Sequence, residues 1–141
     1  MNYLLDTNVV CEPARQTPDP GVIAWLAEAD EDRLHLSAVT LAEVQRGVSR
    51  LPPGRLRERI QHWLSRDVLD RFGDRILPVD NSVAAKWGEL MAAAESAGRA
   101  MSTLDGFIAA TAVMGSFTLV TRNVADFATA VPQIVNPWEG R

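Results

Sequence analysis

The stretch YLLDTN at residues 3–8 decides the fold. Residues 3–5 form a short apolar run, which is typical of a buried strand. Asp6 ends this run, and Thr7 and Asn8 follow with side chains that favour the start of a helix. The stretch therefore predicts a strand that turns directly into a helix.

The same order of short strand and helix repeats along the chain. Apolar runs predict further strands at residues 34–36, 76–79, 118–121 and 134–135. Pro78 cannot donate a ladder hydrogen bond, which restricts its strand to a sheet edge or its own end. Amphipathic spacing and helix-start residues predict helices over about 18–29, 40–50, 56–72, 81–98, 102–114 and 123–128.

Alternating strands and helices predict an α/β protein. The expected architecture is a three-layer α/β/α sandwich with a short, mainly parallel sheet and right-handed crossovers. The length of 141 residues fits one domain, and we expect it to span residues 1–141. Hydrophobic residues make up 47% and charged residues 23%, so the chain has the composition of a folded globular protein.

The cysteine content favours a reducing, cytoplasmic setting. Cys11 is the only cysteine, so an internal disulfide is excluded, and His35 and His62 have no zinc-site spacing. The start MNYLLDTNVV contains an acid and lacks a basic n-region, so we expect neither a signal peptide nor a membrane span.

Charge is distributed unevenly along the chain. The net charge is −4, but residues 46–75 contain eight arginines and four acids, a local net charge of +4. The default interpretation of this arginine-rich segment is a solvated helix face, and the alternative is a surface for phosphate groups.

Four carboxylates lie where a strand is expected to turn into a helix or where a helix is expected to begin: Asp6, Glu43, Asp105 and Asp126. In open parallel sheets, ligands bind outside the carboxyl ends of the strands. Asp6, Glu43 and Asp126 are expected at that edge, whereas the place of Asp105 depends on tertiary packing. The four acids are therefore candidates for one site.

Helix capping is the competing interpretation of these acids. The spacings Thr40-x-x-Glu43, Ser102-x-x-Asp105 and Asn123-x-x-Asp126 match capping boxes or near relatives of them. Asp6 can likewise cap the helix that follows it. Capping and metal binding are compatible, because a capped carboxylate still has a second oxygen.

Carboxylates without histidine or cysteine select hard ions, Mg²⁺ or Mn²⁺. Such ions can orient and activate a water for attack on a phosphodiester and neutralise charge on the phosphate oxygens. The residue types therefore favour metal-assisted phosphate chemistry.

Four motifs together resemble the PIN-domain ribonucleases, specifically VapC-type toxins of type II toxin-antitoxin systems in the FitB-like branch. They are LLDTN at 4–8, LAEVQRGV at 41–48, STLDGFIAATA at 102–112 and LVTRNVADF at 119–127. The resemblance implies a PIN-like fold and a Mg²⁺- or Mn²⁺-dependent endoribonuclease that acts on RNA. It also implies a homodimer and a cognate VapB-like antitoxin, with DNA contacted only through that antitoxin.

The resemblance also implies roles for particular residues. Asp6, Glu43, Asp105 and Asp126 fall on the metal-binding, catalytic acids of the family. The supporting polar positions near them are Thr7, Asn8, Thr121 and Asn123. Many PIN domains have an acid where this chain has Asn123, and that departure leaves Asp126 to carry the fourth position.

Two rival functions belong to other classes. A metal-dependent phosphatase would have a D-x-D pair, and Asp6-Thr7-Asn8 lacks it. A non-catalytic binding module with the same fold would use the acids as caps and act through its arginine-rich segment or a protein partner. Metal binding and RNase activity distinguish this module from the nuclease.

Overall fold

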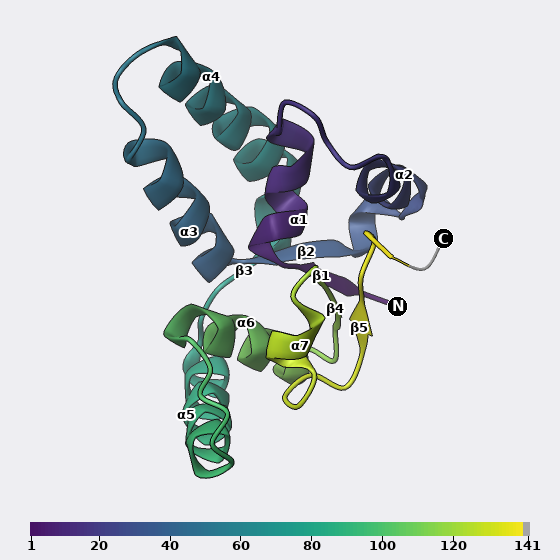
Figure 1. Ribbon diagram of the computed structural model, residues 1–141, viewed down its shortest axis with the longest axis vertical. Helices are drawn as coiled ribbons and strands as arrows, with labels where there is room; N and C mark the ends of the chain where they lie inside the picture. Colours follow the sequence, from purple (N-terminus) through teal and green to yellow (C-terminus); the bar gives the residue numbers. More distant parts are fainter. Residues whose placement is uncertain (140–141) are drawn as a thin grey trace.

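The computed structural model describes residues 1–139 and contains a five-stranded sheet in which every pair is parallel (Figure 1). The strand order is β3-β2-β1-β4-β5. The expected domain of residues 1–141 extends beyond the described residues by positions 140 and 141. The strands are β1 (Tyr3–Leu5), β2 (Leu34–Ser37), β3 (Ile76–Leu77), β4 (Thr118–Val120) and β5 (Ile134–Val135).

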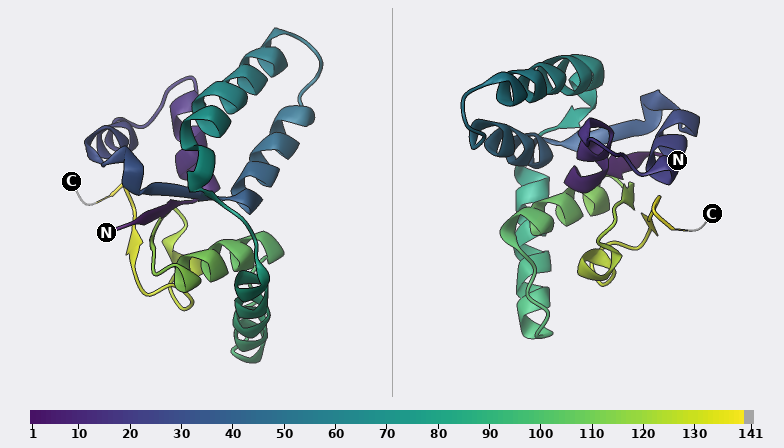
Figure 2. Two further views of the ribbon diagram at one scale, coloured as in Figure 1. Left: turned by 180° about the vertical axis from the view of Figure 1, so that it is seen from behind. Right: turned by 45° about the horizontal axis from the view of Figure 1, so that its top comes forward.

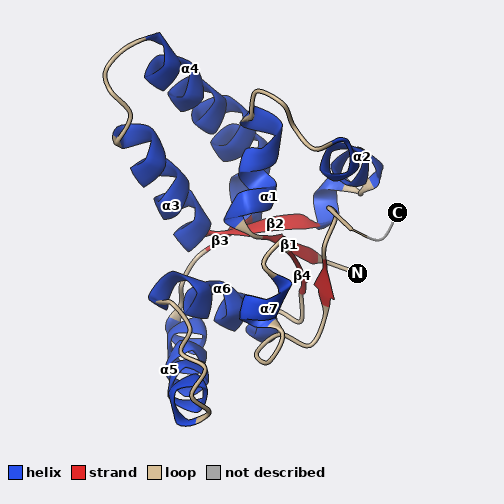
Figure 3. Ribbon diagram, in the orientation of Figure 1, coloured by secondary structure: helices blue, strands red, loops and turns tan. Residues whose placement is uncertain are grey.

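Helices cover both faces of this sheet, which confirms the expected three-layer sandwich (Figure 3). One layer contains α1 (Thr7–Cys11), α2 (Pro20–Glu28), α3 (Ala38–Ser49) and α4 (Arg55–Trp63). A wider, π-type helix at Leu64–Asp70 continues α4. The opposite layer contains α5 (Asn81–Ser96), α6 (Thr103–Met114) and α7 (Val124–Phe127), and α5 extends away from the sheet beside α6 (Figure 2).

Two hydrophobic cores lie on opposite faces of the sheet. Leu5 packs in the core formed with α1 to α4, whereas its neighbour Leu4 packs in the core formed with α6 and α7. Side chains alternate between the faces of a strand, so adjacent leucines serve different layers. Among residues 1–139, no helix is both long enough and apolar enough to cross a membrane.

Two helix starts differ from the sequence-based expectation. Helix α3 begins at Ala38 rather than near residue 40, because the Ser37 hydroxyl accepts a hydrogen bond from Val39 N (3.0 Å). For helix α5 the sequence offers Asn81 or Ser82 as the cap, but the structure uses Asp80, whose carboxylate accepts from Val83 N (2.9 Å). In both cases a good capping residue stands just before the predicted one and satisfies the free N–H groups of the first turn.

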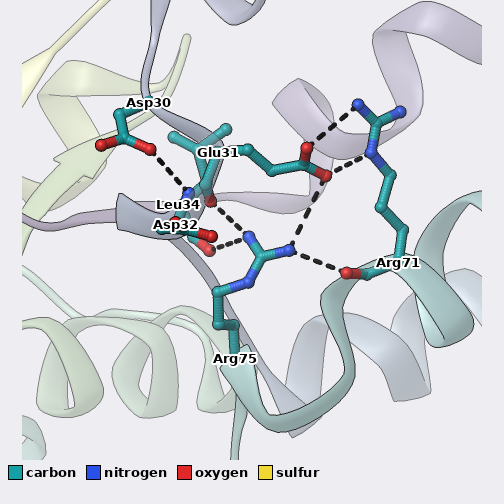
Figure 4. A network of polar contacts seen from close by, with 6 residues as sticks. All are labelled: Asp30, Glu31, Asp32, Leu34, Arg71 and Arg75. Atoms are coloured by element: carbon teal, nitrogen blue, oxygen red, sulfur yellow. Dashed lines mark hydrogen bonds and ion pairs between the residues drawn. The ribbon is translucent and has the colours of Figure 1, made fainter.

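The arginine-rich segment is partly structural (Figure 4). Arg75 donates to the carbonyls of Leu34 (2.9 Å), Arg71 (2.7 Å) and Glu31, while Arg71 forms an ion pair with the Glu31 carboxylate. This network joins the end of the α4 layer to the start of β2. Of the eight arginines of residues 46–75, Arg75 is therefore structural, with 19% of its side chain exposed, whereas Arg71 pairs with Glu31 at the surface with 62% of its side chain exposed.

Edge strand β3 agrees with the effect expected of Pro78. Within residues 1–139 it pairs only with β2, and it ends at Leu77, two residues before the predicted end at Val79. The missing N–H of Pro78 explains the early end, because the ladder cannot continue through it.

Candidate active site

All four predicted acids lie near the carboxyl edge of the sheet. Asp6 follows β1, Glu43 lies on the second turn of α3 after β2, and Asp126 lies on α7 after β4. Asp105 lies in the first turn of α6. The structure thus places Asp105, whose position depended on tertiary packing, on the side of the sheet where the other three acids lie.

Asp6 is the most buried of the four acids, with 4% of its surface exposed. Its Oδ1 accepts a hydrogen bond from Thr7 N (2.8 Å), which caps α1, and its Oδ2 accepts from the Thr121 hydroxyl (2.7 Å). Both oxygens are therefore oriented by neighbouring groups. The capping interpretation is correct for Asp6, and the Thr121 bond adds a contact between β1 and β4 that capping does not require.

Glu43 is held by a residue far away in sequence. The Thr7 hydroxyl donates to Glu43 Oε1 (3.0 Å), so the first turn of α1 orients a carboxylate of α3. The expected capping box between Thr40 and Glu43 is wrong, because Ser37 caps α3 and both residues lie inside the helix. The buried Thr40 hydroxyl has no hydrogen-bond partner within residues 1–139.

The other two capping patterns have different outcomes. Ser102 caps α6 as expected, and its hydroxyl accepts from Asp105 N (3.2 Å). Asn123 makes no side-chain cap, so the expected cap of α7 is wrong; Asp126 N donates instead to the Asn123 carbonyl (3.1 Å). The carboxylate of Asp126 is on an exposed residue of a helix of four residues.

The acids lie close enough together for their charges to raise one another's pKa values. Burial raises the pKa of the Asp6 carboxyl, bonds from Thr121 and Thr7 oppose that rise, and the charges of Asp105 and Asp126 add to it. A cation placed among these groups would relieve both the burial and the repulsion.

Glu43 and Asp105 have raised pKa values for the same two reasons. For Glu43 burial is the main cause, opposed by the Thr7 bond and reinforced by the charges of Asp6 and Asp105. For Asp105 burial is again the main cause, opposed by the Ser102 bond and reinforced by the charge of Asp126. Perturbed carboxylates gathered at one place are a common mark of a functional site.

The supporting polar residues connect the loops around these acids. Asn8 Oδ1 accepts from Arg122 N (3.4 Å), which joins the start of α1 to the loop after β4. The Thr121 hydroxyl, besides donating to Asp6, accepts from Asn123 N (3.0 Å). Thr7, Asn8 and Thr121 thus orient the site through their side chains, and Asn123 does so through its backbone.

The residue types of the four acids suit a hard cation, but their side chains are not close enough together in this structure to form a metal site. Among residues 1–139, no group of three or more Asp, Glu, His or Cys side chains could hold a metal ion as the side chains stand. The available donors are carboxylate oxygens, which suit Mg²⁺ or Mn²⁺, ions that keep several waters and need few protein ligands. The metal-binding role of the four acids remains a prediction.

Two further residues, Cys11 and Arg99, lie beside these acids and were not predicted from the sequence. Burial raises the pKa of the Cys11 thiol to about 11, and the charges of Glu43 and Asp6 contribute, so Cys11 lies close to the site. Arg99 lines the same pocket as Asp105 and Asp126. The only sequence signal for Arg99 is its place directly after Gly98, between a helix end and the Ser102 cap.

Comparison with known proteins identifies the family. The PIN domain model matches residues 3–130. The chain belongs to the PIN-domain family. Its PIN domain is 39% identical over 136 residues to "VapC ribonuclease Y4jK" of Sinorhizobium fredii, covering 96% of this chain and 97% of that protein. It is 39% identical over 135 residues to "Toxin FitB" of Neisseria gonorrhoeae, again covering 96% and 97%.

Solved structures of the PIN-domain family agree with this fold. A structure described as "FitAB bound to IR36 DNA fragment" superposes with a TM-score of 0.93 at 37% identity, covering 99% of this chain and 97% of that one. The predicted PIN-like fold and the predicted resemblance to VapC and FitB proteins are therefore confirmed.

Proposed function

We propose that this PIN domain, residues 1–141, is an endoribonuclease that hydrolyses RNA phosphodiester bonds and acts as the toxin of a VapBC-type pair. The observation that carries the proposal is the set of three acids with raised pKa values, Asp6, Glu43 and Asp105, two of them oriented by threonine hydroxyls. Similarity over nearly the whole chain to proteins named VapC ribonuclease and Toxin FitB supports it.

We propose Mg²⁺ or Mn²⁺ as the cofactor, held by Asp6, Glu43, Asp105 and Asp126. When bound, such an ion supplies charge neutralisation at the phosphate and a more acidic water. The raised pKa values support this choice, because a cation relieves the burial and repulsion that raise them. Without a cation, the acids would repel an RNA backbone.

The threonines have a positioning role in this proposal. Thr7 holds both the Asp6 and the Glu43 side chains, one through its N–H and the other through its hydroxyl. Thr121 fixes the second oxygen of Asp6. These bonds favour the ionised carboxylates, the form that binds cations, and they limit the rotation of both side chains.

We propose a cognate VapB-like antitoxin as the protein partner, a homodimer as the assembly and the cytoplasm as the location, with DNA contacted only through the antitoxin. The basis is similarity to chains from structures described as FitAB bound to a DNA fragment and VapBC2 from Rickettsia felis bound to promoter DNA. Both descriptions name a two-protein assembly.

The test is cleavage of a mixed RNA pool with Mg²⁺ or Mn²⁺, followed by mapping of the cut ends. Asp6→Ala or Asp105→Asn should abolish cleavage while the circular dichroism spectrum is unchanged, and EDTA should stop the wild-type reaction. The control is Asp70→Asn, which changes an exposed acid in the α4 layer.

Unchanged cleavage in either active-site variant would contradict the nuclease assignment. Binding of RNA or of a protein partner by a wild-type chain that never cleaves RNA would favour the non-catalytic binding module instead.

A further inference from the structure

A pocket of about 530 Å³ lies beside the candidate active site, between the α5–α6 connection and α7. Its lining includes Arg99, Ser102, Asp105 and Asp126. Two of the four acids therefore share this pocket with an arginine. Its volume exceeds what one hydrated metal ion needs, so part of the pocket is available to a second group.

The backbone at Arg99 is held in place by the end of α5. Gly98 adopts a left-handed conformation (φ 69°), its N–H donates to the Glu95 carbonyl (3.1 Å), and Arg99 N donates to the Ala94 carbonyl (2.8 Å). These two bonds form a Schellman motif, which ends the helix in a defined geometry. The side chain of Arg99 thus leaves a fixed point at the rim of the pocket.

The guanidinium of Arg99 has no bonding partner in the part of the chain that the structure describes. It forms no ion pair with any carboxylate in residues 1–139, although Asp105 and Asp126 line the same pocket. Arg71 and Arg75, in contrast, are engaged with Glu31 and backbone carbonyls. An arginine that served only to neutralise the acids would pair with one of them, so Arg99 is free for an external anion.

We propose that this pocket binds the RNA phosphate next to the one that is cleaved, with Arg99 as its ligand. The inference rests on the proposed ribonuclease function and adds a substrate subsite to it. The planar guanidinium fork matches two phosphate oxygens. The first turn of α6 forms another wall of the pocket, and its positive dipole end favours an anion as well.

Chain connectivity explains how an anion enters an acidic pocket. A free phosphate would be repelled by Asp105 and Asp126, whereas an RNA phosphate is brought there by the neighbouring nucleotide bound at the active site. The subsite should therefore recognise an RNA chain and not a free anion.

Binding can be measured separately from cleavage. With all four acids unchanged and Ca²⁺, another cation that binds carboxylate oxygens, in place of Mg²⁺, the fluorescence anisotropy of a labelled RNA hexamer gives the affinity at several salt concentrations. Arg99→Gln should weaken binding about ten- to a hundredfold, the usual loss of one charge-assisted hydrogen-bonding group. It should also reduce the slope of log K against log salt by about 0.7, which corresponds to one lost phosphate contact on a single strand.

Two further variants sharpen the measurement. Arg33→Gln removes an exposed arginine beside the amino end of β2, the opposite edge of the sheet, and should change affinity by less than about twofold. Arg99→Lys should keep the salt slope while binding more weakly than arginine, because lysine retains the charge without the fork.

Neutral phosphates identify the contact. We would use a set of hexamers, each with one neutral methylphosphonate at a different position. The protein with Arg99 unchanged should bind one of them more weakly, the one whose neutral phosphate lies next to the cut. Arg99→Gln should bind that hexamer as tightly as it binds the unmodified one.

Each outcome decides between the two proposals. The subsite is refuted if Arg99→Gln binds RNA as tightly as Arg33→Gln does. It is also refuted if the protein with Arg99 unchanged binds no RNA in this assay. If Arg99→Gln loses affinity as expected but the wild-type chain cleaves no RNA, Arg99 remains an RNA phosphate ligand, and the ribonuclease proposal fails together with the position of this phosphate next to a cut.

Discussion

Substituting Gly106 with alanine should loosen the packing of α5 on α6 beside the candidate site. A Cβ at Gly106 would lie 2.7 Å from Met91 Sδ and 2.8 Å from Trp87 Nε1. Non-bonded heavy atoms are most stable at about 3.5–4.0 Å, so close to 1 Å of overlap must be relieved. Methionine is flexible and can move.

Trp87 cannot move at low cost. Its Nε1 donates to the Thr103 carbonyl (3.1 Å), and its ring stacks on Phe107 with centroids 5.0 Å apart and planes 13° apart. Overpacking of this kind costs about 1–3 kcal/mol. Alanine also has about 1 kcal/mol better helix propensity than glycine, so the net change in the free energy of unfolding for Gly106→Ala should be a loss of about 0–2 kcal/mol.

Gly88→Ala is the matched control, because Gly88 lies inside α5 and a Cβ there would meet no atom of the described residues within 4 Å. In this variant only the helix propensity improves, so its free energy of unfolding should rise by up to about 1 kcal/mol. Urea denaturation followed by circular dichroism should separate the two variants by about 1–3 kcal/mol. The packing argument is refuted if Gly106→Ala is stabilised as much as Gly88→Ala.

Thr121→Val removes the hydroxyl bond to Asp6 and should lower the free energy of unfolding by about 1.5–3 kcal/mol; urea titrations should show a larger loss at pH 8 than at pH 4. Burial and Asp126 raise the pKa of Asp105 above 3.8, so its ionisation costs stability. Asp105→Asn should be more stable than wild type at pH 8 and equal to it near pH 3.5. Cys11, with a pKa of about 11, should react with iodoacetamide at pH 8 about a hundredfold more slowly in native protein than in urea; equal rates would contradict its burial.

The positions of the strands, and the edge of the sheet at which the acids lie, could be predicted from the sequence because both depend on local patterns. The apolar run before Asp6 specifies β1, and the carboxyl edge of a parallel sheet follows from the alternation of strands and helices. Asp6 follows β1 directly, and Asp126 lies in the short helix after β4, so their positions needed no knowledge of packing.

Capping assignments and the role of the arginines could not be predicted as reliably. Ser37 and Thr40 are both suitable helix-start residues, and the choice between them depends on where β2 ends in the sheet. Arg75 contacts Leu34 and Glu31, more than 40 residues earlier in the chain, and no local pattern reports such a pair. The same is true of Thr7 with Glu43.

The central strand has a consequence for tolerance to insertions and deletions. Leu4 pairs with Leu119 and Leu5 with Val120, and the two leucines point into separate cores, while Asp6 follows at the edge. Loss or gain of a single residue here would exchange the side chains of the two cores and move Asp6 away from Thr121. Loop lengths elsewhere can vary during evolution, but the spacing between these leucines and the acid is fixed by apolar packing on both sides of the sheet.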